Sequence, residues 1–407
     1  MGYIPAPARG VLYIQAAAPT PQDRVAWWDT ATGQLAYWDD AGAAYVPVGE
    51  SGPGNRDVIL GQAAPGGYQT VAIGDVIGQS GAEAVVIGGD AQALIGDLAG
   101  GSVVLGWSAA STGAAAVVAG YDAAGTTADV AVGSNVTAAG TYSAAVGVGA
   151  ATGPLASHAA ALGPYAVANG YAAVAVGDYA EAHGDQAVAL GQQAVATGAN
   201  STALGRQAEA VEAEAIAIGY GAATSAGATG AIALGQYAIG AGAECLAVGV
   251  YAEVGAGTTE SAAIGPLAYV EGTQATAVGG ATNATGNNGL AAGWGASADI
   301  DGATAVGSAT QITTAGATDA TAVGHSARAQ AVDATAVGAR SQATGARSIV
   351  LGVGYVNATA DAAAIVAHDL EIYRSDAAAS TLIVKSADGT RWRVGVDNAG
   401  ALTIAAA

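Results

Sequence analysis

The sequence predicts an all-β protein in which a parallel β-roll, a solenoid with 14-residue coils, is flanked by a small β-meander at each end. Three observations carry this prediction. Glycines end short apolar segments at a regular spacing in the sequence. Within these segments small and bulky residues alternate, and the composition is rich in small residues and lacks Phe. A fixed short period is typical of repeat architectures, in which each unit buries its apolar face against the next.

The clearest repeats lie between residues 173 and 219, where each unit carries two phrases. One runs from Ala187 to Gly191 (AVALG) and the other from Ala194 to Gly198 (AVATG). Alternation with a period of two residues, ended by Gly, predicts a strand followed by a tight turn. Two strands and two turns in one such short unit leave no room for a helix, so we expect the coils to stack as parallel ladders about 4.8 Å apart.

Glycines at the ends of the predicted strands continue this pattern from Gly74 to Gly352. Of the 19 intervals between them, 13 are 14 residues long, like that from Gly177 to Gly191. Twenty coils at the strand spacing predict a rod about 95 Å long. The longer intervals predict small insertions at corners, for example at Ala222–Gly227 and Ile312–Gly316.

The two faces of the strands differ in kind. Small residues such as Ala187 and Ala189 are expected to meet inside a thin coil, while Glu181 gives the second strand a polar outer face. The bulky aliphatic residues of the first strand then point outward along the rod. Since a long aliphatic stripe is unfavourable in water, we expect copies of the same chain to cover it. The residues expected at this contact are Val188, Leu190, Leu204, Ile216, Ile218, Ile232 and Leu234.

The repeated phrase, in units such as Asn200–Gly205 and Arg347–Gly352, resembles the head repeat of trimeric autotransporter adhesins over roughly residues 58–366. The resemblance implies a left-handed parallel β-roll with three chains around one axis. It therefore implies a homotrimer and an adhesive role.

The amino-terminal residues 1–49 predict a β-meander that attaches to a larger particle, and residues 50–57 predict a Gly/Pro-rich linker. The aromatic residues Trp27, Trp28 and Trp38 could stack on sugar rings or form the core of a small head. A domain this small needs large side chains to fold, which favours the core. The segment is similar to short amino-terminal modules of phage fibres.

After the roll, which is expected to span residues 58–367, residues 368–407 predict a second β-meander with an Asp388-Gly389 hairpin turn. This ending resembles the carboxy-terminal segment of many tailed-phage fibre and minor tail proteins. The resemblance implies a trimeric cap or tip, and we expect receptor contact at Arg391, Trp392 and Arg393.

The acidic composition excludes some partners. The net charge of −21 would become −63 in a trimer (3 × 21), whereas nucleic acids require clustered Lys and Arg. Met1–Pro7 has no basic and apolar signal-peptide pattern, and no run of about 18 apolar residues is uninterrupted. We therefore expect no membrane insertion, and location in a virion that is assembled in the host cytoplasm.

Candidate catalytic groups are sparse. None of the four His has zinc or triad spacing, and Cys245 has no partner for an intrachain disulfide. Glu209, Glu212 and Glu214 cluster, but at an outer face and a corner. We therefore expect no catalytic, cofactor or metal residues and no enzyme activity. Gly-Asp corners, such as Gly177-Asp178 and Gly184-Asp185, leave calcium as an alternative to ordinary Asx turns.

These expectations favour a structural, adhesive fibre of a tailed bacteriophage. Its partners would be a tail, baseplate or capsid protein at the amino-terminal end, and a host receptor, either a glycan or an outer-membrane component. A bacterial trimeric surface adhesin is the first alternative. A polysaccharide-degrading tailspike is the second, and it would require paired carboxylates on a groove.

Overall fold

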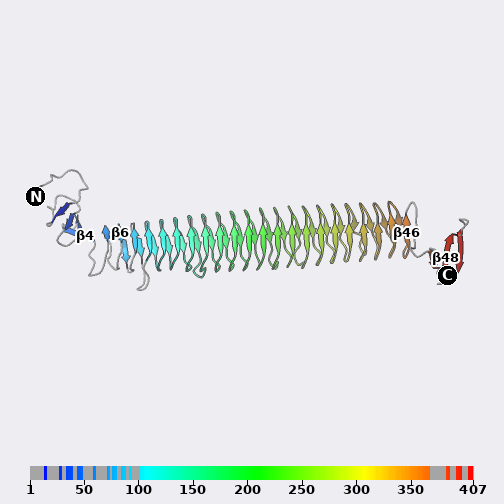
Figure 1. Ribbon diagram of the computed structural model, residues 1–407, viewed down its shortest axis with the longest axis horizontal. Helices are drawn as coiled ribbons and strands as arrows, with labels where there is room; N and C mark the ends of the chain where they lie inside the picture. Colours follow the sequence, from blue (N-terminus) through cyan, green and yellow to red (C-terminus); the bar gives the residue numbers. More distant parts are fainter. Residues whose placement is uncertain are drawn as a thin grey trace.

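The computed structural model describes residues 84–88 and 101–366, together with the backbone of the strands before and after them. Figure 1 shows a rod of stacked coils, and every element in the described part of the chain is a β-strand. Among these described residues no helix is long and apolar enough to cross a membrane. The structure confirms an all-β parallel solenoid of about 19 turns with a predominant 14-residue period.

One ladder, which we call the long-strand ladder, contains the longer strand of each coil. Each strand pairs in parallel and in register with its equivalents in the coils before and after it, so that Ala189 lies beside Ala203. The strands are β5 (Val58–Leu60), β6 (Val71–Ile73), β8 (Val85–Ile87), β10 (Val103–Leu105), β12 (Val117–Ala119), β14 (Val130–Val132), β16 (Ala144–Val146), β18 (Ala160–Leu162), β20 (Val174–Val176), β22 (Val188–Leu190), β24 (Thr202–Leu204), β26 (Ile216–Ile218), β28 (Ile232–Leu234), β30 (Leu246–Val248), β32 (Ala262–Ile264), β34 (Thr276–Val278), β36 (Leu290–Ala292), β38 (Thr304–Val306), β40 (Thr321–Val323), β42 (Thr335–Val337), β44 (Ile349–Gly352) and β46 (Ala363–Val366).

The second ladder, which we call the short-strand ladder, closes each coil on its other side and is also parallel. Its strands are β7 (Val76–Gln79), β9 (Ala91–Ala93), β11 (Ala110–Ser111), β13 (Ala124–Gly125), β15 (Thr137–Ala138), β17 (Ala151–Thr152), β19 (Val167–Ala168), β21 (Glu181–Ala182), β23 (Val195–Ala196), β25 (Glu209–Ala210), β27 (Ala223–Thr224), β29 (Ile239–Gly240), β31 (Glu253–Val254), β33 (Tyr269–Val270), β35 (Asn283–Ala284), β37 (Ser297–Ala298), β39 (Gln311–Ile312), β41 (Arg328–Ala329), β43 (Gln342–Ala343) and β45 (Val356–Asn357).

Strands also occur in the sequence regions that flank the roll. Near the amino terminus β2 (Trp27–Asp29), β3 (Gln34–Asp39) and β4 (Ala44–Val48) pair antiparallel. The sequence did not predict β1 (Tyr13–Gln15), which pairs in parallel with β2. Near the other end, three antiparallel strands form a second small sheet. They are β47 (Leu382–Lys385), β48 (Arg391–Val396) and β49 (Leu402–Ala406). The domain boundaries stay a prediction, and the linker expected at 50–57 lies outside the described residues.

Alanine fills the interior of the roll. In the coil that begins with β22, the four inward residues are Ala187, Ala189, Ala194 and Ala196, and all four are fully buried. The two strands of a coil lie close together, so most inward positions hold alanine, although larger residues such as Val104, Val254 and Ile312 are also fully buried. The expected meeting of the alanine faces inside the coil is confirmed.

At two sites where a larger residue points inward, a glycine faces it. Cys245 occupies an alanine position, and a Cβ on Gly240 would lie 3.3 Å from its sulfur. Val118 replaces alanine in β12, and a Cβ on Gly125 would lie 2.7 Å from one of its methyl groups. In these two layers the missing side chain of glycine makes room for the larger residue, as dense packing requires.

A row of glycines follows the long strands and is required for close stacking of the coils. Gly191 has a φ of +140°, and a Cβ there would lie 2.4 Å from the carbonyl oxygen of Gly205 in the next coil. Its equivalents, from Gly88 to Gly352, all have positive φ values. Both the backbone conformation and the lack of space therefore exclude a side chain.

Each coil has two corners, which we define by their place in the chain. The first corner joins a long strand to the following short strand, as at Gln193, and the second corner leads to the next long strand, as at Asn200. Both residues adopt the left-handed backbone conformation, with φ values of 56° and 57°. These tips are not glycines, although the glycine that ends each long strand from β8 to β44 also has a positive φ. The left-handed conformation costs roughly 1–2 kcal/mol per L residue. A backbone hydrogen bond to the previous coil offsets that cost, with N–O distances of 2.8 Å at both tips.

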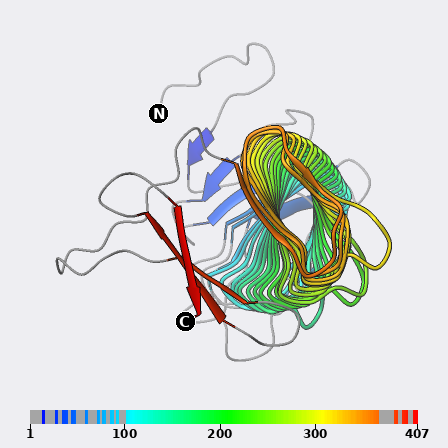
Figure 2. The same cartoon turned by 90° about the vertical axis from the view of Figure 1, so that its right-hand side faces the viewer.

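All variation in coil length occurs at the second corner. From β10 onward, every long strand begins seven residues before the short strand that follows it. Coils that start at β16, β26 and β30 are two residues longer than the common coil, and the coil that starts at β38 is three residues longer. The insertions expected near Ala222–Gly227 and Ile312–Gly316 both belong to this set. Figure 2 shows the extra residues as loops that project from the same edge of the coil.

The coil that starts at β12 is one residue short, and Asp129 compensates for the missing residue. Its buried carboxylate accepts hydrogen bonds from the backbone N–H groups of Thr126 and Ser143, at 2.9 and 2.8 Å. The hydroxyl groups of the same two residues also donate to it. A buried charge is tolerated here because its oxygens have hydrogen-bond donors.

Substitution of Gly191 by Ala should lower the stability of the roll by more than about 1 kcal/mol, because the new methyl group meets the carbonyl of Gly205. The matched control is Gly227→Ala. That glycine also has positive φ, at 84°, but has nothing within 4 Å of its Cβ position. The midpoint of urea unfolding should fall much further for Gly191→Ala. Equal midpoints would show that close stacking does not limit this position.

Deletion of one full coil, residues 178–191, should leave a folded rod that is shorter by about 4.8 Å, because β20 can pair with β24 in the same register. The control is deletion of residues 185–191, half a coil, which would place a long strand against a short one. Circular dichroism and the maximum dimension from solution scattering measure both outcomes. Unfolding of the full-coil deletion would contradict an additive solenoid.

Candidate functional site

The outer side of the long-strand ladder forms a continuous aliphatic face. The first and third residues of each long strand point outward, and from β10 to β44 the third is Val, Leu or Ile in every strand except β12 and β36, where it is Ala119 and Ala292. The face is roughly 86 Å long and roughly 7 Å wide, or about 600 Å². That area is at the upper end of the largest apolar patch found on a typical monomer, and such patches mark interaction sites.

The structure places every predicted contact residue on this face. Val188 and Leu190 lie in β22, and the others follow on the next three long strands. Leu190, Leu204 and Leu234 are 41%, 38% and 41% exposed, and the other four are half-buried. In-register pairing brings the seven residues into two neighbouring rows. Their contact with another copy of the chain stays a prediction.

The two rows of the aliphatic face differ, which the sequence reasoning missed. The third-position row is aliphatic throughout. The first-position row, nearer the second corner, changes from aliphatic residues to mostly threonine toward the carboxy-terminal end of the rod. The threonines of this row are Thr202, Thr276, Thr304, Thr321 and Thr335. The signal was present in the 14-residue period, but it becomes visible only when each strand position is followed separately.

Aromatic side chains stack along the first corner. The rings of Tyr165 and Tyr179 are nearly parallel with centroids 4.8 Å apart, and those of Tyr237 and Tyr251 are 5.2 Å apart. The Tyr165 ring covers Gly149 in the previous coil, where a Cβ would lie 2.7 Å from it. Such pairs are favourable beyond their buried area. In the sequence, this contact could have been predicted from a glycine that stands one coil before an aromatic residue.

Arg206 extends this aromatic row. Its guanidinium carbon lies 4.6 Å from the centre of the Tyr220 ring, and its Nη2 donates to the Tyr220 hydroxyl at 2.9 Å. Hydrogen bonding with Tyr237, and to a smaller extent with Arg206, lowers the pKa of the Tyr220 phenol. These contacts are a local ladder of polar aromatic groups at the surface.

The second corner carries most of the acidic tips. They are Asp185, Glu214, Glu244, Glu260, Asp301, Asp319, Asp333 and Asp361. The last of them pairs with an arginine: Nη2 of Arg347 donates to Asp361 at 2.9 Å. Hydrogen bonding to this guanidinium lowers the pKa of the Asp361 carboxyl group. The charge of the edge is therefore strongly negative between Glu214 and Asp333.

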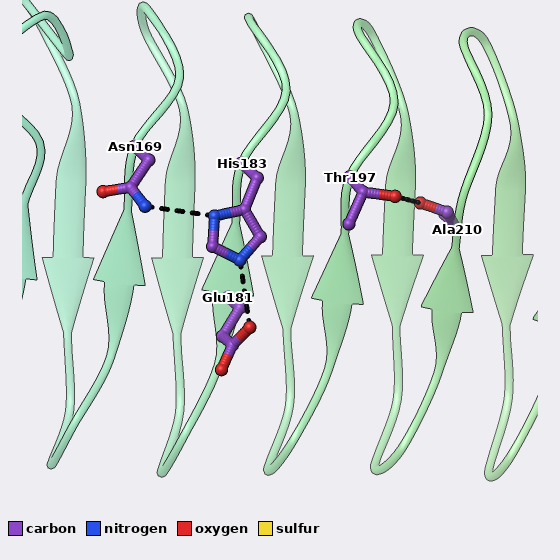
Figure 3. Close-up of polar contacts among 5 residues, drawn as sticks. All are labelled: Asn169, Glu181, His183, Thr197 and Ala210. Carbon is purple, nitrogen blue, oxygen red and sulfur yellow. Dashed lines mark hydrogen bonds and ion pairs between the residues drawn. The ribbon is translucent and has the colours of Figure 1, made fainter.

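The outer face of the short-strand ladder is polar, and Figure 3 shows some of its contacts. Asn169 Nδ2 lies 3.1 Å from Nδ1 of His183, and His183 Nε2 lies 2.9 Å from the Glu181 carboxylate. Because the amide nitrogen can only donate, Nδ1 accepts and Nε2 carries the hydrogen that points to Glu181. In the next coil Thr197 donates to the carbonyl of Val211 at 2.7 Å. These contacts form a hydrogen-bond ladder at the surface of the roll.

The other candidate groups have structural contacts. Asp178 accepts from the Gln192 side chain at 3.2 Å, and Asp185 accepts from the backbone N–H of Tyr171 at 2.9 Å. Glu212 accepts from the N–H of Gly227 at 3.0 Å. Within the described residues no three His, Cys, Asp or Glu side chains gather as a metal site. Burial raises the pKa of the Cys245 thiol, which stays protonated inside the roll.

The expected receptor residues Arg391, Trp392 and Arg393 all lie in β48. Their contact with a receptor stays a prediction.

A family model matches the rod. The model is the YadA head domain repeat, written as two copies of the repeat. It matches residues 156–180, 182–208, 259–282, 315–341 and 329–354. No curated protein matches the chain. All five stretches lie in the stacked coils between β17 and β45. The solenoid of this protein therefore contains YadA head repeats, which is consistent with the β-roll of trimeric autotransporter adhesins.

Proposed function

We propose that this protein is an adhesive, surface-binding fibre formed by three copies of the chain, in which the β-roll acts as a stiff spacer. The observation that carries the proposal is the uninterrupted aliphatic row on the outside of a rod that contains YadA head repeats. Burial of apolar area stabilises association by about 25 cal/mol per Å² before the costs of association are subtracted. A face of about 600 Å² on each chain gives about 1,200 Å² for two facing copies, which is the lower end of the range of stable interfaces.

Within that proposal, we favour a fibre of a tailed bacteriophage. The support is sequence resemblance at both ends of the chain to phage fibre segments. The amino-terminal strands would attach to a tail, baseplate or capsid protein, and the sheet that contains β48 would form the tip. The fibre would then belong to the virion, and its target would be a glycan or an outer-membrane component of the host.

A bacterial trimeric surface adhesin is a second candidate, and the YadA head repeats favour it. A polysaccharide-degrading tailspike has less support. Glu209 lies on the outer short-strand face, Glu214 at the second corner, and Glu212 binds the backbone of a loop. These carboxylates are dispersed over an edge of the coil, so we propose no enzyme activity, cofactor or metal.

Replacement of Ile216 and Ile218 by Asp should convert the assembly to monomers, because each copy would bring two charges into an apolar contact. The control is Val195→Asp with Val211→Asp, which adds the same charge to the outer short-strand face. Light scattering coupled to size exclusion reports the mass. If the Ile216/Ile218 variant keeps the mass of the original assembly, the aliphatic face is not the contact.

Binding to whole cells tests the adhesive role. Fluorescently labelled full-length protein should bind susceptible cells, and the monomeric Ile216/Ile218 variant should bind at least tenfold more weakly because multivalency is lost. Antibody labelling in electron micrographs separates the two candidates: label on phage particles supports the virion fibre, and label on bacterial surfaces supports the adhesin. Unchanged binding by the monomer would remove the argument for a trimeric adhesive unit.

A further inference from the structure

We infer that, in the assembled fibre, the first corner packs against neighbouring copies of the chain and the second corner is the free edge. The inference rests on the proposed self-association and says how each copy is oriented in it. Four independent features of the described residues point in this direction: coil length, apolar surface, charge and the position of the threonines.

Coil length is the first feature. The distance from a long strand to the next short strand is seven residues in all coils from β10 to β44, so the first corner never varies there. The five coils that depart from the common length all differ at the second corner. Loops of two or three extra residues can extend into solvent, whereas they would obstruct a close contact that repeats in every coil.

The apolar surface is the second feature. The third-position aliphatic row is separated from the first corner only by the glycine row, which has no side chains. Beyond those glycines, large apolar groups are exposed at the first corner. They include Tyr165, Tyr179, Val250, Tyr251, Leu267 and Trp294. The aliphatic face therefore continues around the first corner. Large aromatic residues in such a position are typical of the centre of an interface.

Charge is the third feature. The second corner carries the eight acidic tips named above. Among the described residues, the first corner carries only two acidic groups, Asp122 and Asp178, and has Arg206 and Arg340. Rotation about one axis would bring the same edge of three copies together. Two like charges 4 Å apart repel by about 1 kcal/mol even in water and more where water is excluded. The acidic edge is thus stable on the outside and unfavourable near the axis.

The threonines are the fourth feature. They occupy the first-position row, which lies next to the second corner, while the row next to the first corner stays aliphatic. Polar groups accordingly increase across the face from the first corner to the second. At the second corner, the rings of Tyr142 and His158 stack with centroids 5.4 Å apart. The proposed orientation leaves that pair and the inserted loops free on the outside of the fibre.

Single cysteines at matched corner positions test the inference. In a Cys245→Ala background, we compare Gln193→Cys with Asn200→Cys, and Gln207→Cys with Glu214→Cys. Within each pair both residues lie at the surface of one chain, have left-handed φ values between 56° and 60°, and are seven residues apart. In the assembled full-length protein, a maleimide should modify residues 193 and 207 at least tenfold more slowly than residues 200 and 214.

The same variants in the Ile216→Asp/Ile218→Asp background provide the control, because all four cysteines should then react at similar rates. Equal rates in the assembled protein, or slower reaction at residues 200 and 214, would overturn the assignment of the edges and leave self-association standing. If light scattering shows that the Cys245→Ala protein and the original protein are both monomers, the proposed function fails, and the inference fails with it.

Discussion

The structure depends on the in-register stacking of parallel coils at the spacing of one β-strand. Each residue lies directly beside its equivalent in the next coil. A position that has no room for a side chain in one coil therefore has none in the other coils either. The glycine row shows this most clearly: Gly191 lies so close to the carbonyl of Gly205 that no side chain fits there. The same constraint keeps left-handed residues such as Gln193 and Asn200 at the corners, where their N–H groups bind the previous coil.

A thin coil determines where bulky residues can go. With alanines such as Ala189 and Ala196 filling most of the interior, most of the larger aliphatic side chains of the long strands lie on the outside. Each chain therefore keeps much of its apolar surface exposed until something covers it. The proposed self-association completes the burial that the narrow interior cannot provide. In such an assembly, one sequence pattern would serve both the folding of the roll and the contact between copies.

The surface of the roll can change with little effect on its interior. Corner tips vary from tyrosine and glutamine to carboxylate, alanine and arginine side chains, and some form contacts with the same position one coil away, as Gln207 does with Gln193. Insertions follow the same rule, since they occupy the second corner without moving the strands on either side. A scaffold of this kind can present different chemical groups along one edge while its length is set by the number of coils.

The local pattern was sufficient to predict the parallel solenoid, the inward alanines and the outward position of Leu190 and Ile218, because each follows from alternation and from the glycine period within a single unit. Only the tertiary structure showed that residues such as Gln193 adopt left-handed backbone conformations, that Gly240 makes room for Cys245, and that every insertion falls on one edge. Those features arise from contacts between equivalent residues of neighbouring coils, or across one coil. The alternation of residues within one strand does not show which residues of different coils are in contact. Those contacts are determined by how the coils stack.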